Sequence, residues 1–165
     1  MGMLMRPMLA VILLVATAVA AQWTIGVYMC NMRSFKLEAA GMKVVAVQPA
    51  DSDRAKGQTV AENILTANPN IKAIYATNDE MALGALNAAK AAGKQLIIVG
   101  FDASPDALKS IDAGELSGSI AQFPGKIGEL GTLTAAAVAR GEKVDAFVNT
   151  GVAVVTKENV KDFLK

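Results

Sequence analysis

The spacing of apolar residues changes at regular intervals after about residue 41. Short runs rich in β-branched residues, which favour strands, alternate with alanine-rich stretches whose apolar residues recur every three or four positions, as in helices. Strands are predicted at residues 43–47, 71–76, 96–99, 117–122 and 152–155. The helices between them are predicted to end at Asn68-Pro69, Gly93, Gly114 and Gly141.

This alternation predicts the fold class. The first run, residues 43–47, is apolar after Lys43 and predicts a buried strand. Continuous apolar strands that alternate with helices are typical of a parallel sheet covered by helices on both faces. We therefore expect a doubly wound α/β fold.

The first twenty residues have a different pattern. Arg6 is their only charged residue, and an apolar run follows from Met8 to Ala21, interrupted only by Thr17. The run is shorter than the roughly 20 apolar residues that span a bilayer, and Ala18-Val19-Ala20 has the small residues that a signal peptidase needs. We expect residues 1–20 to be a signal peptide cleaved after Ala20, with export to the periplasm.

Composition removes several function classes. The 16 basic and 15 acidic residues leave a net charge of +1, so no basic field is present to bind nucleic acid. Histidine is absent and cysteine occurs once, at Cys30, which disfavours a zinc site or a Ser-His-Asp triad. We expect no metal and no cofactor.

Short polar side chains follow four of the predicted strands: Asp51-Ser52-Asp53, Asn78-Asp79, Asp102 and Gln122. In such sheets ligands bind at the carboxyl ends of the strands. Carboxylates accept hydrogen bonds from hydroxyls, while amides both donate and accept them. The set suits a neutral sugar or polyol better than a phosphate, since Arg54 is the only cation directly at these strand ends.

Helix capping is the simpler explanation for some of these side chains. It is favoured for four of them: Ser52, Asp53, Asp79 and Ser104. For Asp51 both roles stay open. Asn78 and Gln122 fit caps less well, and Asp102 lies two residues before Ser104, the better cap, so these three are the stronger ligand candidates.

Four motifs resemble a known family. They are Gln48-Pro49-Ala50-Asp51, the stretch Asn78-Asp79-Glu80-Met81-Ala82-Leu83-Gly84-Ala85-Leu86, Val99-Gly100-Phe101-Asp102 and Ile120-Ala121-Gln122. Together they resemble the second lobe of ribose-type periplasmic sugar-binding proteins of ABC transporters, from about Gly41 onward. The resemblance implies a type I lobe, a flavodoxin-like three-layer fold, and a binding protein that is not an enzyme.

The resemblance also implies ligand roles. The residues that match Asn78, Asp102 and Gln122 hydrogen-bond the sugar's hydroxyls in that family, and Asp51 and Ser52 lie in its first ligand loop. Ser52 stands where the family has a ring-stacking phenylalanine, and an arginine on the preceding helix has no counterpart here. Another pentose, a hexose or a polyol therefore stays open beside ribose.

The chain is shorter than a two-lobed member of that family. Thr24 to Tyr28 resembles the family's very first strand, so residues 21–40 are expected to be a remnant of a first-lobe strand and a truncated helix. Residues 41–165 would form the C-terminal lobe. In the family, the helix that matches residues 126–140 packs on the first lobe. Its apolar side chains would need another partner here, which suggests a homodimer.

The partners implied are a small sugar or polyol and an ABC transporter permease, with a chemoreceptor as a further possibility. Two other functions stay open. An effector domain of a lac-repressor-type regulator needs a DNA-binding helix-turn-helix before residue 40. A phosphatase-like hydrolase would use Asp51 and Asp53, although Pro49-Ala50 separate this pair from the strand. A lobe unable to bind ligand is a fourth possibility.

Overall fold

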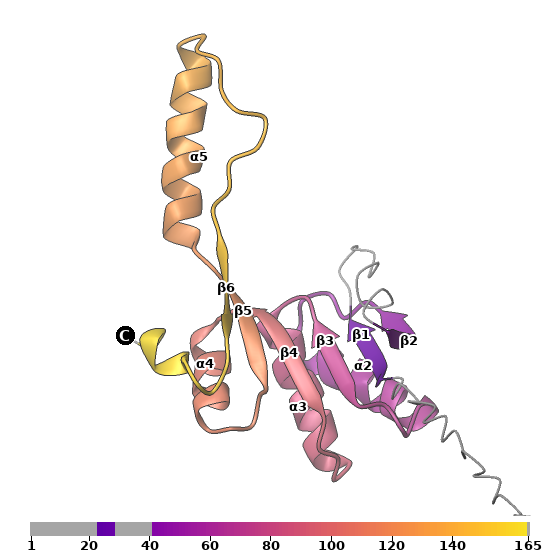
Figure 1. Cartoon of the computed structure of the whole chain (residues 1–165). Helices are drawn as coiled ribbons and strands as arrows, with labels where there is room; N and C mark the ends of the chain where they lie inside the picture. The colour runs from indigo at the N-terminus through magenta and orange to yellow at the C-terminus, as the bar shows by residue number, and fades with distance from the viewer. Residues whose placement is uncertain (1–22, 29–40, 165) are drawn as a thin grey trace, which may run out of the picture.

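The computed structural model describes residues 23–28 and 41–164 (Figure 1). These residues form a six-stranded sheet in the order β2-β1-β3-β4-β5-β6. Its strands are β1 (Trp23–Tyr28), β2 (Met42–Gln48), β3 (Ala73–Ala76), β4 (Ile97–Asp102), β5 (Gly118–Gln122) and β6 (Val152–Val155). All five strands predicted from the apolar runs are confirmed, with ends that differ by a few residues.

The predicted helices are confirmed as well. They are α2 (Arg54–Ala67), α3 (Asp79–Ala91), α4 (Pro105–Asp112) and α5 (Pro124–Ala139), followed by a short 3₁₀ helix, η1 (Val160–Asp162). Ser104 caps α4 by accepting a hydrogen bond from the amide of Ala107. Gly93, just after α3, has a φ of +62°, which glycine adopts without steric cost and which ends the helix.

The direction of the last strand differs from the prediction. Strands β1 to β5 are parallel, but β6 pairs with β5 in antiparallel fashion, with Gln122 opposite Val152. The chain leaves the sheet at the carboxyl end of β5, passes through α5 and returns to the same edge, so it can only enter β6 in the opposite direction. The sheet is therefore mixed, and the prediction of a wholly parallel sheet is wrong at this strand.

Helices α2, α3 and α4 cover one face of the sheet (Figure 1). The strands from β2 to β5 are reached in one direction across the sheet, and right-handed crossovers then place every connecting helix on the same side. The core lies between these helices and the strands, and Ile64, Ile74, Met81, Ile98 and Ile111 are almost fully buried in it. The truncated helix predicted before residue 41 lies outside the described residues.

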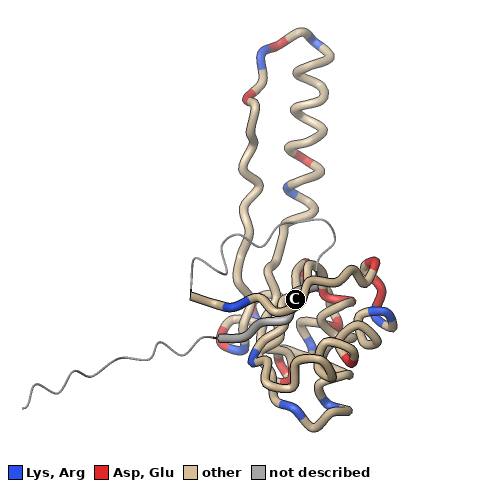
Figure 2. The backbone as a smooth tube through the Cα atoms, turned by 90° about the vertical axis from the view of Figure 1, so that its right-hand side faces the viewer, with Lys and Arg blue, Asp and Glu red and all other residues tan. Residues whose placement is uncertain are grey.

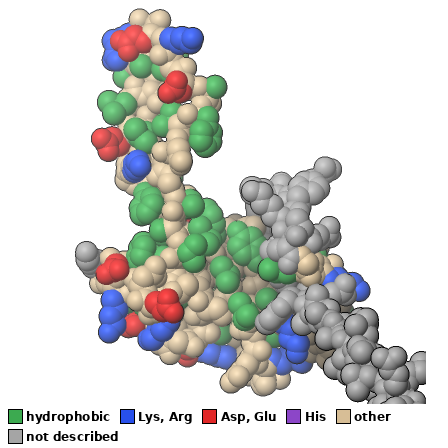
Figure 3. All heavy atoms as spheres, viewed as in Figure 1, with side chains coloured by type: hydrophobic (Ala, Val, Ile, Leu, Met, Phe, Trp, Pro, Cys, Tyr) green, Lys and Arg blue, Asp and Glu red, His purple; other side chains and the backbone are tan. Residues whose placement is uncertain are grey.

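The second face of the sheet is apolar and partly exposed. Phe101 on β4 lies opposite Ile120 on β5, which lies opposite Val154 on β6, so the three share this face. Val154 is 60% exposed. Figure 3 shows hydrophobic side chains gathered over the strands on this side.

Strand β2 is not buried as predicted. It is the edge strand of the sheet, and most of its residues are half-buried or exposed. Val47, near its end, is 52% exposed. Apolar content therefore predicted the strand correctly but not its place at the edge.

Residues 124–151, which we call the arm, project from the body of the protein, formed by the other described residues (Figures 1 and 2). The arm consists of α5 and the extended segment that returns from it to β6. None of the α5 residues is buried, and Leu133 is 59% exposed. The arm thus carries a helix without a core behind it.

The N-terminal predictions are only partly covered by these residues. The signal peptide and its cleavage after Ala20 lie outside the described part of the chain. Strand β1 pairs with both β2 and β3, so residues 23–28 belong to the same sheet as the rest. The division at residue 41 stays a prediction. Among the described helices, none is long and apolar enough to cross a membrane.

Candidate functional site

The three stronger ligand candidates stand at the carboxyl ends of three adjacent strands. Asp102 and Gln122 are the last residues of β4 and β5, and Asn78 follows β3 by two residues. The side-chain amide of Gln122 donates from Nε2 to Oδ1 of Asp102, at 2.5 Å. This pair presents a carboxylate and an amide side by side, the combination that two neighbouring sugar hydroxyls require.

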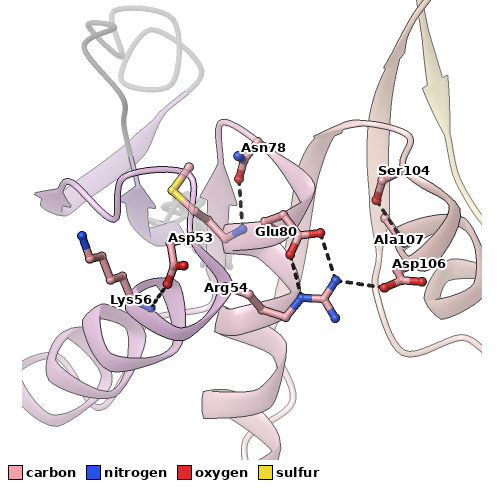
Figure 4. A network of polar contacts seen from close by, with 9 residues as sticks. Asp53, Arg54, Lys56, Asn78, Glu80, Ser104, Asp106 and Ala107 are labelled. Atoms are coloured by element: carbon pink, nitrogen blue, oxygen red, sulfur yellow. Dashed lines mark hydrogen bonds and ion pairs between the residues drawn. The ribbon is translucent and has the colours of Figure 1, made fainter.

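Asn78 has a structural role that the sequence analysis disfavoured. It is the N-cap of α3, and its Oδ1 accepts a hydrogen bond of 3.0 Å from the amide of Met81 (Figure 4). The prediction that it fits a cap less well is therefore wrong. The cap uses only the oxygen, and Nδ2 donates to no residue in the described part of the chain. A cap and a donor to ligand are compatible in this side chain.

The backbone at Asp102 is strained. Asp102 has a φ of +113° and Ala103 a φ of +55°, values that residues other than glycine rarely adopt. Each such residue costs on the order of 1–3 kcal/mol and persists only when its surroundings hold it. Such strain is often found where a side chain must be aimed at a ligand.

Asp79 is a buried acid and not the helix cap that its position suggested. It is only 1% exposed, and its carboxylate crosses from the start of α3 to the amide of Ser104 and the hydroxyl of Ser119. Burial raises the pKa of Asp79, and the hydrogen bonds from Ser119 and Ser104 oppose that rise. The cap prediction failed because Asn78, one residue earlier, already occupies the N-cap.

The loop after β2 stands apart from the other three. Asp51 and Ser52 both have positive φ values, and this left-handed turn places Asp53 at the N-cap of α2. Asp51 forms an ion pair of 2.9 Å with Lys56. The cap role predicted for Ser52 is therefore wrong, and the one for Asp53 is confirmed. Since β1 separates β2 from β3, ligand roles for Asp51 and Ser52 stay predictions.

Arg54 is occupied by two carboxylates. Its guanidinium binds both oxygens of Glu80 at 2.9 Å and Oδ2 of Asp106 at 3.0 Å (Figure 4). These bonds raise the pKa of Arg54 and lower that of Asp106. The guanidinium ties the first turns of α2, α3 and α4 together and is neutralised there, which disfavours a phosphate site at these strand ends.

The sequence analysis missed this ion-pair network, as well as the contact between Asp79 and Ser119. A signal existed for the first: Arg54, Glu80 and Asp106 each lie in the first turn of a helix at the same edge of the sheet. The contact between Asp79 and Ser119 could not be predicted in this way. The pattern of β5 places Ser119 on the inward face, but the sequence does not specify which strands are neighbours. The residues that the structure describes contain no cluster of acidic or cysteine side chains that could hold a metal ion.

Comparisons with known proteins show the family of this chain. The family profile of the periplasmic binding protein domain matches residues 15–143. The ribose import binding protein RbsB of Haemophilus influenzae is 46% identical over 121 residues, covering 73% of this chain and 41% of that protein.

Solved structures lead to the same family. An ABC transporter solute-binding protein of Actinobacillus succinogenes with bound D-allose superposes with a TM-score of 0.75 at 28% identity, covering 88% of this chain and 56% of that one. One from Bacillus halodurans with bound myo-inositol superposes with a TM-score of 0.72 at 31% identity, covering 87% and 54%.

The match is to one part of larger proteins. The chain spans about two fifths of the length of the curated relative and about half of the solved chains. The range matched by the family profile includes the strand ends that carry Asn78 and Asp102. The chain belongs to the periplasmic binding protein family and has its type I fold.

Proposed function

We propose that this chain binds a neutral sugar or polyol as the solute-binding component of an ABC import system. The observation that carries the proposal is the pair of Asp102 and Gln122 at adjacent strand ends, with the Nδ2 donor of Asn78 on the next strand. The relatives support the class of ligand, since their names and bound molecules include ribose, allose and myo-inositol.

We expect binding by this chain alone to be weak. Each hydrogen bond to a neutral group contributes about 0.5–1.5 kcal/mol net, so three such bonds give about 1.5–4.5 kcal/mol. Association costs at least about 4 kcal/mol in lost freedom of motion. These bonds therefore barely offset the cost, and since millimolar affinity needs about 4 kcal/mol net, we expect affinity that is millimolar or weaker.

Calorimetry with ribose, allose and myo-inositol tests this proposal. Asp102→Ala is expected to abolish binding, while Asp145→Ala, which removes an exposed acid of the arm, leaves it unchanged. Absence of binding to all three ligands at tens of millimolar would contradict sugar binding. Micromolar binding by a monomer would contradict the weak open site.

The two alternative functions are less well supported. A hydrolase needs Asp51 and Asp53 available for chemistry, but Asp53 accepts from the amide of Lys56 to cap α2, and Asp51 pairs with the Lys56 ammonium. A transcriptional regulator is disfavoured because the similar proteins carry names of import binding proteins. A binding protein that performs no reaction is the function we propose.

For localisation we propose export with cleavage after Ala20, supported by the Ala18-Val19-Ala20 motif. Intact-mass measurement of the protein from the cell envelope should give a chain that starts at Ala21. A mass that retains residues 1–20 would contradict cleavage. In the periplasm the sugar-loaded protein would dock on a permease of the same import system, which co-purification from a membrane extract can test.

We also propose a homodimer formed through the arm. Ile127, Leu133 and Val138 are exposed on α5, and apolar surface of this kind favours association. The charges of the arm cancel, since its three basic and three acidic residues are Lys126, Arg140, Lys143, Glu129, Glu142 and Asp145. Two copies can therefore approach without net repulsion along this segment.

Light scattering at rising protein concentration tests the dimer. Leu133→Lys is expected to shift the protein toward monomer. Thr132→Lys is the matched control, because its side chain lies about 100° around the helix from Leu133 and away from the apolar side. A protein that stays monomeric at high concentration would contradict the proposal.

A further inference from the structure

The conformation of Asp102 and Ala103 needs a cause outside these two residues. Both have positive φ values, +113° and +55°, and neither side chain favours such angles over ordinary ones. Asp102 is the residue whose carboxylate accepts the hydrogen bond from Gln122. Whatever holds this backbone therefore also determines where the carboxylate points.

Two buried side chains hold the amides that follow Asp102. The amide of Ala103 donates to Oγ of Ser119 at 3.0 Å, and the amide of Ser104 donates to Oδ2 of Asp79 at 2.6 Å. Ser119 in turn donates from its hydroxyl to Oδ1 of Asp79, at 2.7 Å. The two acceptors come from the start of α3 and from β5, so the residues that follow β4 are held by both neighbouring elements.

Burial makes these contacts hard to replace. Ser119 is 0% exposed and Asp79 1% exposed, so water cannot take over the lost hydrogen bonds when either side chain is removed. Gly100 on β4 completes the arrangement, because a Cβ at this position would collide with Oδ1 of Asp79. The space for the carboxylate thus exists only because residue 100 has no side chain.

We infer that Asp79 and Ser119 are positioning residues for the ligand edge. They form a buried latch that keeps Asp102 and Ala103 in the left-handed conformation and so aims the Asp102 carboxylate at Gln122. The latch itself is a property of the fold, and its consequence for sugar binding rests on the function proposed above. Neither residue needs to touch the ligand.

Nuclear magnetic resonance of the full chain without ligand tests the latch. Ser119→Ala is expected to accelerate hydrogen exchange at the Ala103 amide by about tenfold and to shift the signals of Asp102 and of the Gln122 side-chain amide. Ser117→Ala is the matched control, because Ser117 Oγ also accepts from a backbone amide, that of Ile98 at 3.0 Å, at the other end of β4. The control is expected to leave Asp102, Ala103 and Gln122 unchanged.

Asp79→Asn provides a second variant if Ser119→Ala does not fold. It keeps the shape of the side chain but replaces one of the two carboxylate oxygens, which accept from the Ser104 amide and the Ser119 hydroxyl, with an NH₂ group. The signals of Asp102, Ala103 and the Gln122 side chain should therefore shift. Unchanged exchange at Ala103 and unchanged Asp102 signals in a folded variant would overturn the inference. This readout needs no sugar, so it decides the latch even if the sugar proposal fails.

The ligand readout separates positioning from general stability. If calorimetry detects binding by the unmodified chain, Ser119→Ala is expected to weaken it about tenfold at a temperature where the variant is folded, while Ser117→Ala, at the other end of β4, leaves the affinity unchanged. Equal effects of the two variants on affinity would overturn the positioning role.

Discussion

The body and the arm of this protein carry similar helices in opposite situations. Helix α3 has nine of its 13 residues buried, whereas α5 has none of its 16 buried. Both helices are rich in alanine and contain leucine, and α5 has no charged residue from Leu130 to Ala139. The apolar content of a helix therefore does not decide whether it is buried; the surface opposite the helix does. Helix α5 has the composition of a core helix but lacks a partner surface.

Replacement of a core side chain should separate the two regions most clearly. Ile74, almost fully buried on β3, is expected to cost about 2–5 kcal/mol of unfolding free energy when changed to alanine. Leu133→Ala on the arm should change the unfolding free energy by less than about 0.5 kcal/mol at concentrations where the protein is monomeric. Denaturant unfolding of both variants at low protein concentration measures the difference. A comparable loss for Leu133→Ala in the monomer would mean that another part of the same chain covers the arm.

Glycine replacements should differ in sign between the two regions. At Gly84, where α3 meets α2, a Cβ would collide with the carbonyl oxygen of Arg54 and approach the amide of Gln58 to 2.7 Å. Gly84→Ala is expected to destabilise the protein by about 1–3 kcal/mol. At Gly131 on α5 a Cβ meets nothing within 4 Å, and Gly131→Ala should stabilise the helix by about 1 kcal/mol. Thermal unfolding followed by circular dichroism compares the two variants, and destabilisation by Gly131→Ala would show that α5 has close neighbours.

A smaller change in stability is expected from pH. Among the described residues the buried acidic side chain, Asp79, lies in the body and not in the arm. Burial raises the pKa of Asp79, so its contribution to stability is present below the unfolded-state pKa of about 3.9 and is lost as pH rises through the folded-state pKa. Asp106 and Glu115 have lowered pKa values because they lie beside Arg54 and Lys90. Their contribution to stability is therefore present above the unfolded-state pKa and is lost as pH falls through the lowered pKa. Carboxyl titration by nuclear magnetic resonance should place Asp79 above Asp106. The reverse order would show that the Asp79 carboxyl is hydrated.

The smallest effects should come from ion pairs. Exposed pairs contribute about 0–1 kcal/mol. Arg54→Ala, which removes a network joining three helices of the body, should fall at the upper end of that range, while Arg140→Ala, which removes a local contact with Glu142 on the arm, should have no measurable effect. Denaturant unfolding in low and high salt compares them. A larger loss for Arg140→Ala would contradict the view of the arm as an independent extension.

Most of the fold was predictable because it depends on local signals. The spacing of apolar residues, the cap at Ser104 and the helix end at Gly93 each depend on residues only a few positions apart, and the structure confirms all three. The features that were not predictable depend on distant partners. Sheet order makes β2 an edge strand, and the excursion through the arm reverses β6.

The candidate site shows the same division. The polar residues at the strand ends were identified from the sequence, since each stands at the end of a predicted strand or within a few residues of it. The cap at Asn78 was missed because asparagine and aspartate are both good caps and adjacent here. The burial of Asp79 was missed because its partner Ser119 lies forty residues away, and a contact at that separation leaves no local pattern.

In the part of the chain that the structure describes, the arm joins the sheet at its two ends. One is Phe123, directly after Gln122; the other is Gly151, directly before Val152, and Gln122 and Val152 are paired across β5 and β6. Gly151 has a φ of +79°, and the ring of Phe123 lies beside it. The arm therefore joins the sheet directly beside the candidate ligand edge. A force applied to α5 by a binding partner would reach the backbone one residue from Gln122, whose side chain donates to Asp102.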